Sequence, residues 1–116
     1  MNLSDKKLEK IENEIRGSVI DALKDGWDIG PGTYISRIEG VKSCCPLGAV
    51  LLRIQRRNIR LKEHEAHEPD ALEEYLGIDG SARCAFWEGF DSLPTSGSTK
   101  TKLHEMGERF RKEFVK

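Results

Sequence analysis

Apolar residues recur every three or four positions near the N-terminus, which is the spacing of one face of an α-helix. This spacing predicts a helix over residues 5–25. Its buried stripe consists of Leu8, Ile11, Ile15, Val19, Ala22 and Leu23. Ser4 suits the N-cap position because its hydroxyl can accept a hydrogen bond from the first helical turn. Gly26 is free to adopt the left-handed conformation that ends many helices.

Residues 26–43 lack this spacing and predict a long structured loop with a short hairpin at residues 33–38. Its helix-breaking residues are Gly26, Gly30, Pro31, Gly32 and Gly40. Its large side chains are Trp27, Ile29, Tyr34, Ile35, Ile38 and Val41. A long loop in a compact domain is often functional, and Tyr34 is then a candidate binding residue. The alternative is a plug that covers one end of the helical core.

The rest of the pattern predicts four further helices. One begins at Cys45-Pro46, because proline suits the first helical position, and ends near Arg57; Gly48 leaves room for another helix to approach. The other three run from Pro69 to Leu76, from an Asp79 cap to Phe90, and from a Ser98 cap through Leu103, Met106, Phe110 and Phe114. The predicted fold class is therefore all-α: a single small domain, residues 1–116, of about five helices.

Composition narrows the function classes. Nineteen basic and twenty acidic residues give a net charge of −1, so any binding to nucleic acid needs a local basic patch. No apolar stretch is long enough to span a bilayer, and the N-terminus lacks the apolar run of a secretory signal. Three cysteines, an odd number, in a chain without an export signal indicate reduced thiols and not a disulfide framework. We therefore expect a cytoplasmic protein without a membrane segment.

The cysteine and histidine clusters do not form a recognised metal or catalytic signature. Cys44 and Cys45 lie at a predicted helix N-terminus, where a thiolate can be stabilised, but packing explains them as well. His64 and His67 are three residues apart, whereas the zinc-protease motif needs a spacing of four. We predict no cofactor and no metal, although a small enzyme or metal protein built on these four residues stays open.

Two charged segments are the remaining candidates. The first, here called the arginine strip, could bind phosphate and consists of Arg53, Arg56, Arg57 and Arg60. The alternative for this strip is a solvated face or internal ion pairs. In the second segment, Trp87 to Asp91, aromatic flanks could raise a carboxylate pKa, but a core turn that ends in a capping aspartate is the simpler interpretation.

Three short motifs carry a resemblance. They are Cys45-Pro46-Leu47-Gly48-Ala49, Leu76-Gly77-Ile78 and Gly89-Phe90-Asp91. On these motifs, residues 44–91 resemble short uncharacterised proteins of bacteria and phages. The resemblance implies no activity, but a small charged phage protein is more often a modulator of a host protein than an enzyme.

We therefore expect a protein-binding modulator, of the phage or mobile-element accessory (anti-defence) type, with a host protein as its partner. The alternative is a nucleic-acid or nucleotide-phosphate binder that uses the arginine strip. An exposed apolar stripe on the first or last helix would instead favour a homodimer.

Overall fold

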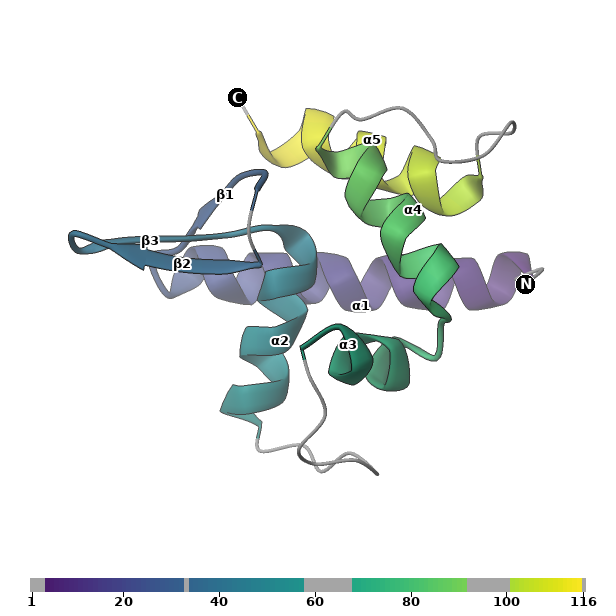
Figure 1. Cartoon of the computed structure of the whole chain (residues 1–116), viewed down its shortest axis with the longest axis horizontal. Coiled ribbons are helices and arrows are strands. Elements are labelled where there is room, and N and C mark those ends of the chain that lie inside the picture. Colours follow the sequence, from purple (N-terminus) through teal and green to yellow (C-terminus); the bar gives the residue numbers. More distant parts are fainter. Residues whose placement is uncertain (1–3, 33, 58–67, 92–100, 116) are drawn as a thin grey trace.

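The computed structural model of the protein describes residues 4–32, 34–57, 68–91 and 101–115. Five helices dominate it: α1 (Asp5–Lys24), α2 (Pro46–Arg56), α3 (Glu68–Leu76), α4 (Gly80–Phe90) and α5 (Lys102–Phe114). A small sheet contains β1 (Asp28–Ile29), β2 (Ile35–Ile38) and β3 (Val41–Cys44). The predicted single domain of five helices is confirmed, with this sheet beside α1 and α2 (Figure 1).

Side-chain caps set the helix starts, as the sequence predicts for two of them. The Ser4 hydroxyl accepts a hydrogen bond from the N–H of Lys7 at 3.1 Å, and Asp79 begins α4 in the same way. The predicted Ser98 cap is wrong, because the N-cap of α5 is Thr101. Ser98 itself lies outside the described residues. Several successive polar residues before this helix can act as an N-cap, so the sequence does not single out one of them. The first buried residue of the helix is Leu103.

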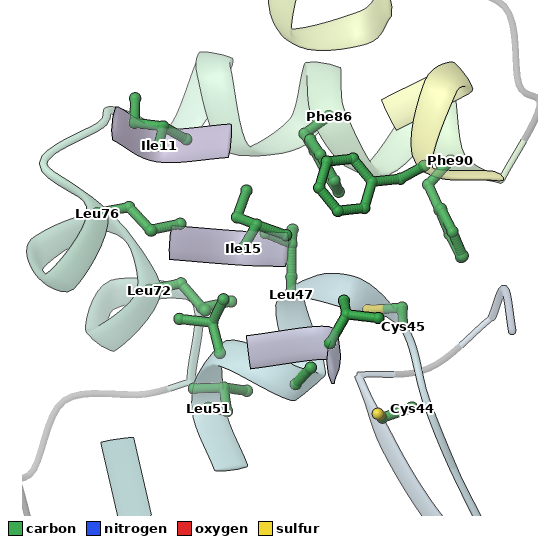
Figure 2. Packing of buried hydrophobic residues seen from close by; sticks show 14 of the residues in the cluster. Ile11, Ile15, Cys44, Cys45, Leu47, Leu51, Leu72, Leu76, Phe86 and Phe90 are labelled. Carbon is green, nitrogen blue, oxygen red and sulfur yellow. The ribbon is translucent and has the colours of Figure 1, made fainter. Parts of the chain in front are cut away.

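The core gathers apolar side chains from all five helices and from the base of the sheet. Figure 2 shows α1, α2, α3 and α4 contributing to one cluster. Phe86, Phe90 and Phe110 are at most 1% exposed, and the Phe86 and Phe110 rings meet edge to face at 5.6 Å. The predicted α1 stripe is buried except for Leu23, which is 45% exposed. Leu23 follows buried Ala22 by about 100° around the helix, so it turns away from the core.

Three of the described glycines lie so close to another part of the backbone that a side chain would not fit. A Cβ atom on Gly89 of α4 would lie 2.1 Å from the carbonyl oxygen of His104 in α5. A Cβ on Gly107 of α5 would lie 2.2 Å from the carbonyl oxygen of Phe86. Gly48 was expected to admit another helix, but a Cβ there would meet the Tyr34 carbonyl oxygen at 1.7 Å. The close neighbour of α2 is therefore the preceding loop.

The loop contains an antiparallel hairpin that is longer than predicted. β2 pairs with β3, and β1 pairs with β3 in parallel, so β2 is an edge strand. The turn is Glu39-Gly40, with φ values of 49° and 81°. Two successive positive φ angles are typical of the type I′ turn that matches strand twist. The range 33–38 thus covers only the first strand, because Glu-Gly is a weaker hairpin signal than Asn-Gly.

The two interpretations of the loop apply to its two ends. At the base, Trp27, Ile29 and Cys44 are at most 9% exposed and cover the core. At the tip, Ile38 and Val41 are 66% and 56% exposed. Figure 1 shows the hairpin extending away from the helices. The base is therefore a plug, whereas the tip is free to meet another molecule.

Candidate functional site

The first residue of the arginine strip is buried. Arg53 is 8% exposed, and its guanidinium donates hydrogen bonds to Glu14 Oε1 and Asp21 Oδ2 of α1, each at 2.9 Å. A Cβ atom on Gly17 would lie 2.8 Å from Arg53 Nη2, so the absence of a side chain there makes room for the guanidinium. Arg53 therefore joins α2 to α1.

The two carboxylates around Arg53 are held ionised. Burial alone would raise the pKa of Glu14, but hydrogen bonds from Tyr75 and Arg53 outweigh it and lower that pKa. The hydrogen bond from Arg53 also lowers the pKa of Asp21. The Tyr75 hydroxyl of α3 donates to Glu14 as well. Ion pairs therefore join α2 to α1 in this cluster, and a hydrogen bond joins α3 to α1.

The other arginines of the strip have different surroundings. Arg56 pairs with Asp25 and lies 4.0 Å from Asp21. Arg57 is exposed at the C-cap of α2, and Arg60 lies outside the described residues. The alternative of internal ion pairs thus holds for Arg53 and Arg56. Carboxylates of α1 and of its C-cap therefore interrupt the described part of the strip.

A second positive region lies where the hairpin meets the ends of α1 and α2. We call it the basic hollow; its lining residues are Asp25, Trp27, Arg37, Lys42, Leu52, Gln55 and Arg56. It is an open depression of about 550 Å³. Arg37 and Lys42 stand directly opposite each other in the β2–β3 register. Their cationic groups lie 4.9 Å and 5.3 Å from the centroid of the Trp27 ring.

Tyr34, the candidate binding residue of the loop, is half-buried and hydrogen-bonded. Its hydroxyl accepts a hydrogen bond from Arg83 Nη1 of α4 at 2.8 Å, and its carbonyl accepts one from the N–H of Cys45. Burial raises the pKa of the Tyr34 hydroxyl. Tyr34 therefore connects the base of the loop to α2 and α4.

The paired cysteines are packed into the core. Cys44 and Cys45 are each 1% exposed, and burial raises their pKa values to about 12 and about 11. The Sγ atom of Cys45 accepts a hydrogen bond from the N–H of Gly48 at 3.3 Å and so caps α2. For Cys45, burial outweighs the backbone hydrogen bonds at the start of α2, and the 1% exposure of both thiols agrees with the packing interpretation.

The other sequence candidates add no built site. Within the described ranges, His, Cys, Asp and Glu side chains do not gather into a group of three that could hold a metal ion. His64 and His67 lie outside those ranges. Asp91 caps the C-terminus of α4, as expected, and burial raises its pKa. None of the described helices is long and apolar enough to cross a membrane.

Comparison with known proteins leaves the site to be interpreted from its own geometry. No protein-family model, no curated protein and no solved structure matches the chain. The pairing of Arg37 with Lys42 and of Ile38 with Val41 was not predicted from the sequence. A Glu-Gly turn read as type I′ would have placed both pairs, because it fixes which residues face each other across the strands.

Proposed function

We propose that this protein is a small protein-binding module that modulates a host protein and docks through the tip of the β2–β3 hairpin. One observation carries the proposal: Ile38 and Val41 face each other across the strands while 66% and 56% exposed. A single exposed apolar residue is ordinary, but two adjacent ones at a projecting tip favour a partner surface.

The position of β2 supports the same function. As an edge strand, β2 has backbone groups that point away from β3 and can pair with an added strand. β2 contains no proline, which would remove a backbone N–H from such pairing. A partner segment in extended conformation would thus gain main-chain hydrogen bonds and contact the apolar tip.

The proposed role as a phage or mobile-element protein is based only on the sequence resemblance. The motif at Cys45–Ala49 and its two companions motivate a phage or mobile-element accessory protein, with anti-defence as the proposed activity. Nucleic-acid binding through the arginine strip has less support, because Arg53 already pairs with two carboxylates of α1 and Arg56 pairs with Asp25, the C-cap of α1. The protein-binding proposal is therefore the better supported of the two.

Affinity capture from a lysate of the encoding organism, or of its host, tests the proposal. The immobilised chain is compared with the double variant Ile38→Thr/Val41→Thr, which keeps β-branched side chains while removing apolar surface. The matched control is Ile20→Gln/Leu23→Gln, which removes exposed apolar groups from α1. We expect a specific partner on the wild type and the control and its loss from the hairpin variant.

Two results would contradict the proposal. One is capture of the same partner by the hairpin variant. The other is a wild-type mass in light scattering that equals twice the chain and falls to one chain in the hairpin variant. That second result would make the tip a homodimer face.

A further inference from the structure

Two like charges are held together on the hairpin at a cost. Arg37 and Lys42 are directly opposed in the β2–β3 register, and like charges in that position destabilise a strand pair. The chain as a whole has a net charge of −1, so this pair does not reflect a general excess of cations. Contacts of both cations with the Trp27 ring offset this repulsion, so the pair gives the hairpin little net stability.

The positive charges of Arg37 and Lys42 are not neutralised by a direct contact with a carboxylate in the described ranges. In the described ranges, neither Arg37 nor Lys42 forms a salt bridge; both lie over Trp27, and Lys42 Nζ also donates to the Asp25 carbonyl at 2.9 Å. Arg56, the third cation of the hollow, faces Asp25. The lining thus carries three positive charges and one negative charge, a net of +2.

We infer that the basic hollow binds an acidic, Asp- or Glu-rich peptide segment of the partner protein. This inference rests on the proposed protein-binding function and names the chemistry of the partner. Carboxylates match guanidinium and ammonium groups in charge and in hydrogen-bonding geometry. The alternation of side chains along a strand places Arg37 and Lys42 on one face of the hairpin and Ile38 and Val41 on the other. A partner that contacts both groups must therefore reach both faces of the hairpin, around its tip or around the free edge of β2.

The hollow suits a peptide better than a nucleic acid. Bases bind proteins in part by stacking on aromatic rings, but Trp27 is only 6% exposed. A phosphate backbone also needs a continuous track of cations, whereas Asp25 and Asp21 lie beside Arg56 at this end of α1. A short stretch of carboxylates is the anion that this small positive area can match.

Hexaglutamate is the probe for this inference, and the indole N–H signals of nitrogen-15-labelled full-length protein are the readout. The chain has two tryptophans, and the Trp27→Phe variant assigns their signals. At low ionic strength, we expect hexaglutamate to move the Trp27 signal in a saturable way and to leave the Trp87 signal in place. Arg37→Gln/Lys42→Gln should weaken binding about tenfold, since it removes two charge-assisted contacts.

The matched control is Lys6→Gln/Lys112→Gln, which removes two exposed cations elsewhere and should change affinity less than about twofold. Equal weakening by this control, or the absence of a Trp27 shift, would overturn the inference. So would binding of hexathymidylate or inorganic phosphate as tight as that of hexaglutamate.

The two proposals fail separately. The hairpin variant Ile38→Thr/Val41→Thr should still bind hexaglutamate. If hexaglutamate does not bind but partner capture still depends on the tip, only the acidic-segment inference falls. If hexaglutamate binds but no partner is captured, the proposed function falls.

Discussion

Two arginines of this protein differ in how their charge is neutralised. Arg53 is buried between Glu14 and Asp21, and its side chain links α2 to α1. Arg37 is exposed on the hairpin, opposite Lys42, with a tryptophan ring beneath it and no carboxylate partner in the described ranges. From the sequence, only the first of these arginines was predicted to be a binding residue. Charge matched inside the protein stabilises the fold, whereas charge left unmatched at the surface is available to a ligand.

The largest expected effect concerns the base of the hairpin. Gly48→Ala places a Cβ against the Tyr34 backbone, which cannot yield as a side chain can. We expect a loss of about 3 kcal/mol in the free energy of unfolding, measured by urea denaturation. Gly30→Ala, in open space, should cost less than about 1 kcal/mol. A small effect of Gly48→Ala would show that the hairpin base is loosely attached.

Arg53→Met should have the next largest effect. It leaves Glu14 and Asp21 without their shared cation, but both carboxylates are about one-third exposed, so water compensates in part. We expect a loss of about 2 kcal/mol in the free energy of unfolding. The matched change Arg57→Met, at an exposed position, should cost less than about 0.5 kcal/mol. Equal losses would remove the distinction between buried and exposed arginines.

Acid should weaken the same cluster. The pKa values of Glu14 and Asp21 are lowered in the folded protein, so the unfolded chain takes up protons at a higher pH than the folded chain does. Their contribution is full above the ordinary pKa values of 4.5 and 3.8 and is lost as pH falls below them. Urea unfolding across this pH range should show that loss, and Glu14→Gln should make it shallower. An unchanged slope would contradict this role of Glu14.

A smaller and opposite effect is expected at the hairpin turn. Glu39 has φ of 49°, a conformation that asparagine tolerates better than glutamate. Glu39→Asn should stabilise the protein by about 0.5 to 1 kcal/mol in thermal or urea unfolding. Glu39→Gln removes the same charge without relieving the backbone and should give no such gain. Equal gains from both variants would assign the effect to charge.

Much of the fold was predictable because its signals are local. The stripe ending at Ala22, the Ser4 and Asp79 caps and the proline at the start of α2 each depend on neighbouring residues. The predicted burial of Leu23 and the predicted Ser98 cap were wrong, because Ala22 and Thr101, at nearby positions, take these roles. The close neighbour of Gly48 was missed because a glycine shows that something approaches but not what approaches.

The candidate site was less predictable because it depends on long-range pairing. Arg53 meets Glu14 across thirty-nine positions of sequence, so spacing within α2 did not reveal that its charge is matched. Arg37 and Lys42 are near in sequence, but they face each other only because Glu39 has a positive φ in the turn between them. Glutamate rarely adopts that conformation, so the sequence does not indicate it. That Trp27 is buried beneath these two cations could be seen only in the folded structure.

The most direct test of the comparison is the unfolding free energy of Arg37→Gln/Lys42→Gln. Relief of like-charge repulsion should offset the lost contacts with Trp27, so we predict a change of less than about 0.5 kcal/mol in urea unfolding. A loss comparable to that of Arg53→Met, about 2 kcal/mol, would contradict the account. It would show that the hairpin cations hold the fold together and are not left for a ligand.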